Sequence, residues 1–328
     1  MMEKGAILEI RDLEVRFHTR NGTSTVINRL NLSLNRGETL GVVGESGCGK
    51  SITALSIMRL ISCPPGEIGT GTIFFENRDL LKLDDKEMRK VRGNKISMIF
   101  QEPMTSLNPV FSVGEQISEV YRLHQGIGRK EAWNRSVEML KAVGIPSPEK
   151  RVREFPHQLS GGMRQRIMIA MALACRPSLL IADEPTTALD VTVQAQIFDL
   201  MNTIKEEMET GIIFITHNMG AIARMADRVA VMYAGLKVEE GRVKDILEKP
   251  KHPYTVGLIS CVPHLEADPK EEREALTEIP GMVPSLFDRG KGCPFAQRCP
   301  QVQPKCREKM PPTVSLDGSH EVTCWLEA

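Results

Sequence analysis

Residues 44–51 read GESGCGKS, and this stretch decides the fold class. It fits the pattern G-x-x-x-x-G-K-[ST], whose glycines let the backbone curl so that successive N–H groups face a chain of phosphates. The pattern requires a strand before the loop and a helix after it. Here the apolar run ETLGVVG (38–44) precedes the loop and the helical pattern KSITALSIMRLI (50–61) follows it. The sequence therefore predicts an α/β fold with a phosphate site at the end of a strand.

The polar side chains of this phosphate loop have predicted roles. We expect Lys50 to reach the terminal phosphates and the Ser51 hydroxyl to coordinate Mg²⁺. Cys48 stands at a variable position of the pattern and is expected to be inert. The predicted nucleotide contacts are the loop and the residue after it: Gly44, Glu45, Ser46, Gly47, Cys48, Gly49, Lys50, Ser51 and Ile52.

A second polar feature follows the apolar run LLIA (179–182), where Asp183 and Glu184 stand at the end of a predicted buried strand. Asp183 is predicted to hold Mg²⁺ through water, and Glu184 to polarise the attacking water as a general base. The alternative is an acidic turn that caps the next segment. Together with the phosphate loop, the two carboxylates are typical of P-loop NTPases of many kinds.

The composition excludes several other classes. The chain has 328 residues, of which 41% are hydrophobic, and its 42 basic residues balance 42 acidic ones, so no overall field favours nucleic acid or an anionic membrane. The start, MMEKGAILEIRD, lacks the apolar stretch of a signal peptide, and the longest apolar run (167–175) is about half of the roughly 20 residues that a membrane helix needs. We expect a cytoplasmic protein whose cysteines are thiols or metal ligands rather than disulfides.

The remaining patterns alternate along the chain. Residues 7–17 and 25–34 are predicted as short strands, and residues 102–155 as a mostly helical insertion. Strand and helix patterns then alternate again as far as about Leu247, as in a parallel sheet covered by helices. Beyond that point the composition becomes rich in proline and cysteine, which indicates an appendage.

A family resemblance begins with LSGGMRQR at residues 159–166. It is similar to the signature of ATP-binding cassette (ABC) proteins, in which a serine and two glycines open a helix and offer a hydroxyl and backbone N–H groups to an anion. As a bare string it could also be a helix N-cap. The fifth position of the signature is commonly Gln and is Met163 here, whereas Ser160, Gly161 and Gly162 remain.

Three further pieces follow the family's order across residues 40–220. Gln101, after the strand pattern ISMIF, resembles the Q-loop glutamine. The tripeptide ALD (188–190) resembles the D-loop, and His217, at the end of IIFITH, resembles the switch histidine. This order favours the ABC signature over a simple helix N-cap at Ser160 and identifies the chain as a member of the ABC family.

The resemblance implies a head-to-tail pair of cassettes, with ATP between the Lys50 loop of one subunit and the Ser160 loop of the other. The implied organisation is an ATPase core at residues 1–101 and 156–247, a helical subdomain at 102–155 and a C-terminal extension at 248–328. Gln101 would sense the Mg²⁺ ion and the attacking water, His217 would contact the γ-phosphate or that water, and Asp190 would act across the dimer contact.

Phe17 lies 27 residues before Gly44, about where the family keeps an aromatic ring. The resemblance implies that this ring stacks on adenine. The alternative is a strand residue that faces the core.

A narrower resemblance involves KHPYTVGLI (251–259) and the Q-loop context FQEPMTSLNPV (100–110), which are similar to segments of oligopeptide and dipeptide importers. His252-Pro253-Tyr254 read alone is only a turn that opens a helix. The resemblance implies a peripheral ATPase on the cytoplasmic face of the membrane. Its implied partners are a second ABC ATPase, which is either a paralogue or a second copy, two integral membrane permeases and an extracytoplasmic substrate-binding protein.

Two alternatives to peptide import remain open. Relatives of the same appearance carry nickel or other small solutes. A soluble ABC ATPase that acts on nucleic acid or ribosomes is a different class, and the single cassette and zero net charge disfavour it.

The C-terminal cysteines form a third candidate site. Cys293, Cys299, Cys306 and Cys324 have the spacing C-x₅-C-x₆-C-x₁₇-C in a region with few apolar residues, where a metal would supply cohesion. The spacing lacks the paired knuckles of zinc modules and does not match ferredoxins. The resemblance to importer tails favours a [4Fe–4S] cluster, while Zn²⁺ and unliganded thiols remain alternatives. His320 could replace one ligand, but a lone exposed histidine is the preferred interpretation.

Overall fold

The computed structural model describes residues 2, 5–20, 22–101, 106–186, 189–261, 278–284, 290–316 and 318–328. Residues 102–105 of the predicted Q-loop context and Ala188 of the predicted D-loop lie outside this described part. By packing, the chain divides into two compact units. Unit 1 comprises Met1–Leu8, Ser33–Thr39 and Phe74–Ile215, and unit 2 comprises Glu9–Leu32, Leu40–Ile73 and Thr216–Ala328.

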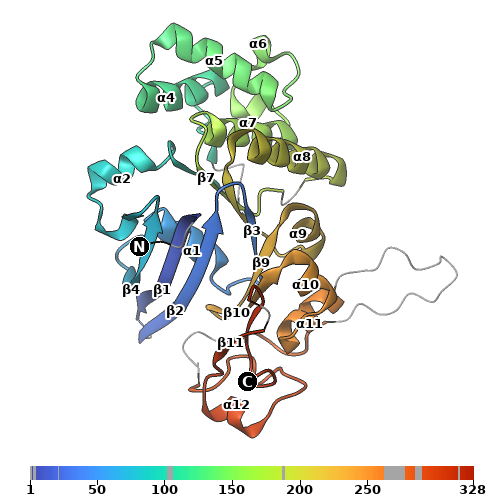
Figure 1. Ribbon diagram of the computed structural model, residues 1–328. Helices are drawn as coiled ribbons and strands as arrows, with labels where there is room; N and C mark the ends of the chain where they lie inside the picture. Colours follow the sequence, from blue (N-terminus) through green and yellow to red (C-terminus); the bar gives the residue numbers. More distant parts are fainter. Residues whose placement is uncertain are drawn as a thin grey trace, which may run out of the picture. The chain divides into compact units, whose positions relative to one another are not determined.

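Unit 1 consists of helices and short strands (Figure 1). Its elements are β5 (Arg78–Asp79), η1 (Leu80–Lys82), α2 (Asp85–Val91), β6 (Ile96–Ile99), α4 (Val113–Gln125), α5 (Arg129–Ala142), α6 (Pro148–Arg151), η2 (Pro156–Gln158), α7 (Gly161–Leu173), β7 (Leu179–Asp183), α8 (Val191–Met208) and β8 (Gly211–Ile215).

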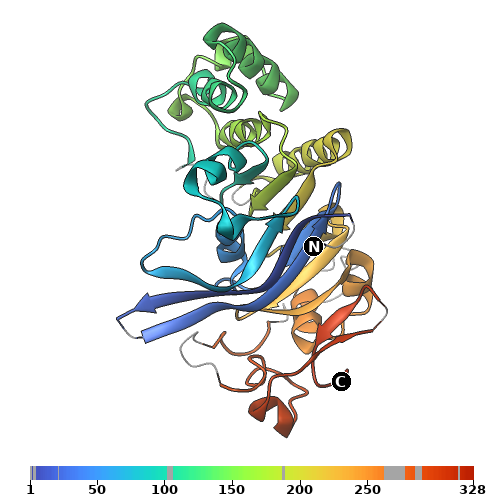
Figure 2. The same cartoon turned by 60° about the vertical axis from the view of Figure 1, so that its left-hand side comes forward.

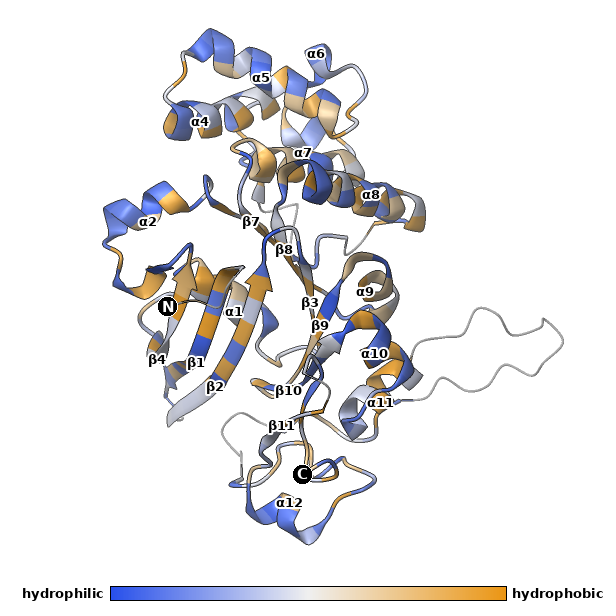
Figure 3. Ribbon diagram, in the orientation of Figure 1, coloured by the Kyte–Doolittle hydropathy of each residue, from blue (hydrophilic) through white to orange (hydrophobic). Residues whose placement is uncertain are grey.

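Strand β7 lies between β6 and β8 in unit 1, and both pairings are parallel. Every residue of β7 and β8 is buried, and both strands are mainly hydrophobic (Figure 3). Parallel strands that are covered on both faces have such continuous apolar sequences. The parallel arrangement places the carboxyl ends of β6 and β7, and therefore Gln101 and Asp183, at one edge.

The helical part of unit 1 consists of α4, α5 and α6: α4 and α5 pack on each other and on α7, and α6 packs on α5. Helix α4 begins with a capping box: the Ser112 Oγ accepts the Glu115 N–H at 3.3 Å, and the Glu115 carboxylate accepts the Ser112 N–H at 2.9 Å. Gly114 allows close packing, since a Cβ there would lie 2.5 Å from Cγ2 of Val152. In the described part of the helical insertion predicted at 102–155, these three helices lie between residues 113 and 151.

Unit 2 holds most of the antiparallel strands. Its elements are β1 (Ala6–Thr19), β2 (Gly22–Asn35), β3 (Thr39–Val43), α1 (Lys50–Ile57), β4 (Gly66–Phe75), α9 (Met219–Met225), β9 (Arg228–Tyr233), β10 (Leu236–Arg242), α10 (Val243–Glu248), α11 (Pro253–Ser260), α12 (Pro304–Glu308), β11 (Thr313–Ser315) and β12 (Glu321–Thr323). Strands β1, β2 and β4 extend by two or three residues into unit 1, and β3 begins there.

Two sheet regions organise unit 2. In the first, β1 lies between β2 and β4, and the long strands β1 and β2 run side by side (Figure 2). In the second, β3 pairs with β9 in parallel, and β9 pairs with β10 through a two-residue hairpin at Ala234 and Gly235, both with positive φ. The predicted strands at 7–17 and 25–34 are confirmed, but at 14 residues each they are longer than predicted.

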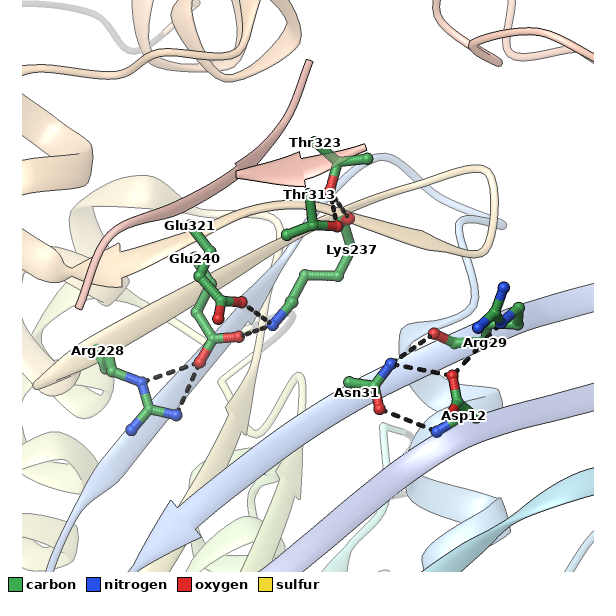
Figure 4. A network of polar contacts seen from close by, with 9 residues as sticks. All are labelled: Asp12, Arg29, Asn31, Arg228, Lys237, Glu240, Thr313, Glu321 and Thr323. Carbon is green, nitrogen blue, oxygen red and sulfur yellow. Dashed lines mark hydrogen bonds and ion pairs between the residues drawn. The ribbon is translucent and has the colours of Figure 1, made fainter. Parts of the chain in front are cut away.

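The C-terminal extension continues this second sheet. Strand β12 pairs with β10, and β11 pairs with β12. Figure 4 shows how charges reinforce the junction: the Lys237 ammonium contacts Glu240 and, at 2.9 Å, Glu321, while Arg228 contacts Glu240 at 2.7 Å. Polar contacts therefore help to hold β12 against β10.

Within the described part of the chain, no helix combines the length and the apolar composition that crossing a membrane requires.

Candidate functional site

The phosphate loop follows β3 directly, and its glycines have backbone geometry that other residues rarely adopt. Gly44 has φ 151°, and a Cβ there would lie 2.1 Å from the carbonyl oxygen of Met232. Gly49 has φ 106° and forms the N-cap of α1. The loop therefore curls and ends at a helix N-terminus, whose free N–H groups favour an anion.

Lys50 lies inside this curl and is only 6% exposed. Its ammonium donates hydrogen bonds to the carbonyl oxygens of Gly44 at 2.7 Å and Glu45 at 3.1 Å. The neighbouring Cys48 is buried, and burial raises the pKa of its thiol although Lys50 opposes the effect. The thiol therefore remains protonated at neutral pH, as expected of an inert position.

The other loop residues have graded exposure. Ser46 and Gly47 are exposed, whereas Glu45, Ser51 and Ile52 are half-buried. Ser51 and Ile52 belong to the first turn of α1, so the Ser51 hydroxyl stands next to the helix N-terminus.

The acidic pair in unit 1 ends β7. Asp183, 4% exposed, is its last residue, and Glu184 follows with φ 48°, which is uncommon outside glycine. The Glu184 N–H donates to the carbonyl of Ile215 at 2.9 Å. Gln101 lies just beyond β6, and its Nε2 donates to Oε2 of Glu184 at 3.0 Å. The structure thus brings together two of the three residues predicted as catalytic.

Ser160 is the exposed N-cap of α7, and its Oγ accepts the Met163 N–H at 3.4 Å. Gly161, which follows it, has open space where a Cβ would stand. A Cβ on Gly162 would lie 3.3 Å from Cγ1 of Val193. The residues predicted to face an anion therefore lie at an exposed helix N-terminus, and the N-cap alternative and the anion role are compatible.

The remaining predicted contacts are separate side chains. Asp190 is the exposed N-cap of α8, where its Oδ1 accepts the Val193 N–H at 2.9 Å. His217 is exposed two residues after β8 ends. Phe17 on β1 is half-buried beside Gly66, so its ring is neither fully packed in the core nor fully free.

The four C-terminal cysteines line one small cavity, together with His252 and Phe295. Cys306 and Cys324 are buried, and the N–H of Cys293 donates to the carbonyl of Cys306 at 2.7 Å. Burial, with smaller contributions from the other three cysteines, raises the pKa of Cys293 to about 11. Among the described residues, no three His, Cys, Asp or Glu side chains converge closely enough to hold a single metal ion.

The histidines of the extension differ from the prediction. His320, predicted as exposed, is 5% exposed, and its Nε2 lies 2.8 Å from Oε1 of Glu239. The prediction was wrong because β12 carries the preceding loop against β10, which short-range sequence cannot indicate.

His252 is the histidine that lines the cysteine cavity. Its Nδ1 accepts the Tyr254 N–H at 3.0 Å, and burial lowers its pKa to about 4. In the neutral ring that results, the proton is on Nε2, and this buried atom has no hydrogen-bond partner among the described residues.

Three residues with contacts at these sites were missed by the sequence analysis. Gln165 on α7 donates to the carbonyl of Pro185, next to the acidic pair. Tyr254 and Arg298 both contact Glu45 of the phosphate loop. Spacing gave no signal for any of them, and Tyr254 drew attention only through the resemblance.

Comparison with protein families gives two matches. Residues 27–187 match the family described as ABC transporter. Residues 238–306 match the oligopeptide/dipeptide transporter, C-terminal region, a range that includes three of the four tail cysteines.

Curated relatives are similar over almost the whole chain. The oligopeptide transport ATP-binding protein OppD of Bacillus subtilis (strain 168) is 52% identical over 99% of this chain and 90% of its own length. The dipeptide transport ATP-binding protein DppD of the same organism is 49% identical over 99% and 96%. OppD of Salmonella typhimurium is 52% identical over 93% and 89%.

Among solved structures, the ATP-binding cassette MJ0796, in a dimeric post-hydrolysis state bound to ADP and Pi, aligns with a TM-score of 0.65 and 26% identity. The alignment covers 72% of this chain and 98% of that one.

Proposed function

The chain belongs to the ABC transporter family and is an ATP-binding subunit of the oligopeptide and dipeptide transport type, and from this premise we propose that it hydrolyses ATP to drive peptide import. The observation that carries the proposal is the phosphate loop, where Lys50 lies buried inside a glycine-rich curl that ends at a helix N-terminus. Such a loop binds the phosphates of a nucleotide through backbone N–H groups and one ammonium.

The nucleotide contacts that we propose include the loop, Phe17 on the adenine and the oxygen ligands of Mg²⁺. The Ser51 hydroxyl, the Gln101 side chain and the buried Asp183 carboxylate suit Mg²⁺ because this ion prefers oxygen ligands. When bound, Mg²⁺ would neutralise charge on the phosphate oxygens.

Hydrolysis is assigned to Glu184 as the general base for the attacking water. Gln101 supports this role, because its amide at 3.0 Å fixes the carboxylate from the neighbouring strand end. His217 would contact the γ-phosphate. Ser160, with Gly161 and Gly162, and Asp190 would act on a nucleotide held by a second ABC subunit, so turnover depends on dimer assembly.

We place the contact with the membrane subunits on the helical part of unit 1. A hollow of about 550 Å³ lies there between residues of α4 and α5. Its lining includes Phe111 and Leu123, which are 49% and 74% exposed, together with Trp133. Exposed apolar side chains around a hollow favour a protein partner. In this arrangement the chain is peripheral on the cytoplasmic face, with two permeases and a substrate-binding protein as partners.

We further propose that Cys293, Cys299, Cys306 and Cys324 hold a [4Fe–4S] cluster, with Zn²⁺ as the alternative. The donor set fits, because four thiols line one cavity beside the buried Nε2–H of His252, and sulfur-rich anionic groups accept such N–H donors. A single Zn²⁺ needs four sulfurs within about 2.3 Å of one point. Zinc is therefore disfavoured, because no three metal-ligating side chains converge in this way among the described residues. The cluster would stabilise the extension.

Uptake by the native host tests the transport function. Deletion of the gene should abolish uptake of labelled dipeptides or oligopeptides, and the wild-type chain should restore it. Glu184→Gln should fail to restore uptake, whereas Glu207→Gln, on the exposed side of α8, should succeed. Normal peptide uptake in the deletion strain, with loss of nickel uptake, would contradict the proposal and identify a different cargo.

Anaerobic purification followed by iron, sulfide and zinc analysis tests the cluster. We expect about four irons and four sulfides per chain and a broad absorption band near roughly 400 nm. Stoichiometric zinc without iron would contradict the cluster and support the zinc alternative. If neither metal is found, the four cysteines are free thiols.

A further inference from the structure

Arg298 of the C-terminal extension holds Glu45, which is the second residue of the phosphate loop. Nη1 of Arg298 lies 2.6 Å from Oε2 of Glu45, and Nη2 lies 2.9 Å from Oε1. The two residues are 253 positions apart in the sequence. Two parallel N–H···O bonds of this kind fix orientation as well as distance, because both partners are planar.

Arg298 is itself fixed by its surroundings, and its side chain is only 5% exposed. Its Nε donates to the carbonyl of Pro280 at 3.0 Å and its Nη2 to the carbonyl of Ile279 at 3.0 Å. The guanidinium also lies 5.8 Å from the ring centre of Tyr233 and 5.9 Å from that of Phe295. The Glu45–Arg298 pair is therefore a built contact and differs from an exposed ion pair, which contributes little.

Tyr254 holds the backbone of the same residue. Its buried hydroxyl accepts the Glu45 N–H at 2.8 Å. The ring packs against Tyr233 and Phe295, with ring centres 4.6 Å and 5.5 Å away. The C-terminal segments thus fix both the peptide group and the carboxylate of Glu45.

The charge of Glu45 explains why such a contact matters for ATP. A carboxylate within a phosphate loop repels the triphosphate that the loop is built to bind, and it does so strongly where the surroundings are partly dry. The guanidinium of Arg298 compensates this charge at hydrogen-bond distance. The negative charge at this position of the loop is therefore compensated only when the C-terminal extension is in place.

We propose that Arg298 and Tyr254 are positioning residues for ATP: by neutralising and fixing Glu45, they make the C-terminal extension part of the nucleotide site. This inference rests on the proposed function of the loop as the ATP site. It also connects the two ends of unit 2, because Arg298 lies on the turn between Cys293 and Cys299, and its N–H donates to the carbonyl of Phe295 at 3.0 Å.

ATP binding to the purified full chain, measured by calorimetry at low and moderate salt, tests the proposal. Arg298→Ala should weaken ATP binding about tenfold, since it leaves an unpaired carboxylate in the loop. The defect should shrink as salt rises, because screening weakens the repulsion. Glu45→Gln in the Arg298→Ala background should return the affinity to within about threefold of wild type, since the repelling charge is gone.

Two further variants and one control complete the test. Arg298→Lys keeps the charge but loses the bidentate geometry, and Tyr254→Phe keeps the ring but loses the hydroxyl, so each should weaken binding by a factor of about two to five. Arg151→Ala, which removes an ion pair with Glu154 in unit 1, should leave ATP affinity unchanged. These conservative variants keep the proposal testable if Arg298→Ala unfolds.

The outcomes are distinct. Wild-type affinity in folded Arg298→Ala overturns the inference while the ATP site stands. A loss that Glu45→Gln does not restore also overturns it, because Arg298 would then act only through the fold. Failure of the wild-type chain to bind ATP would instead refute the proposed function of the loop.

Discussion

The phosphate loop and the C-terminal extension belong to the same compact unit, but different kinds of contact build them. In the loop, Lys50 bonds to carbonyls five and six residues away, and three glycines permit the curl. In the extension, Lys237 meets Glu321 across 84 residues and Arg298 meets Glu45 across 253. A site that is closed by local contacts can therefore be predicted from the sequence, whereas a site assembled from distant segments cannot.

The largest effect should come from a buried cysteine of the extension. If the four cysteines hold the proposed cluster, Cys306→Ala should abolish metal binding and lower the free energy of unfolding by several kcal/mol, because the binding energy of a structural metal is also folding energy. Metal analysis and urea unfolding under anaerobic conditions measure both. An unchanged metal content would show that this cysteine is not a ligand and that the extension has another source of cohesion.

The next effect concerns the loop itself. Lys50→Ala should weaken ATP binding about 10- to 100-fold, because hydrogen bonds to charged groups contribute roughly 1.5–3 kcal/mol. Equilibrium titration with ATP measures it, with Lys249→Ala as the control at an exposed position. Thermal unfolding shows whether Lys50→Ala, which loses two hydrogen bonds to loop carbonyls, is still folded. Unchanged ATP affinity in Lys50→Ala would mean that the loop does not bind phosphates.

A smaller effect is expected at the junction shown in Figure 4. Lys237 is 13% exposed, and burial disfavours its charge while Glu240 and Glu321 outweigh this and raise its pKa. Lys237→Met should lower the free energy of unfolding by about 1–3 kcal/mol, since it leaves Glu240 partly uncompensated. Urea unfolding measures the loss, and Lys82→Met on an exposed side chain is the control. Equal stability of the two variants would show that the junction needs no charge pairing.

The smallest effect separates the buried cysteine of the phosphate loop from the buried cysteines of the extension. Cys48→Ala in the loop should change ATP affinity by less than about twofold and leave the metal content unchanged, because the thiol is protonated and lies at a variable position. The same assays as for Cys306→Ala apply. Loss of metal in Cys48→Ala would break the distinction between the two regions.

Sequence predicted the elements whose signals are local. The loop lies between β3 and α1 as its pattern requires, the strands β7 and β8 lie at the runs LLIA and IIFITH, and α4 and α5 lie within the helical insertion predicted at 102–155. The sequence also placed Gln101 and Glu184 at strand ends. That both belong to one edge, with their side chains hydrogen-bonded, follows from the parallel pairing of β6 and β7.

Long-range partners could not be predicted. His320 was expected to be exposed and is buried against Glu239, 81 residues away. Tyr254 looked like part of a turn that opens a helix, which it is, but its hydroxyl also holds the phosphate loop. No pattern within a short window records such contacts, because the partners are 81 and 209 residues apart in the sequence.

The most direct test of the central claim measures ATP turnover and ATP-dependent dimerisation of Glu184→Gln, with Glu207→Gln as control. If Glu184 is the general base of an ABC ATPase, the variant binds ATP as the wild type does, turns it over about 10²- to 10⁴-fold more slowly and forms a dimer that persists with ATP. Hydrolysis at a near-normal rate by Glu184→Gln would contradict the account.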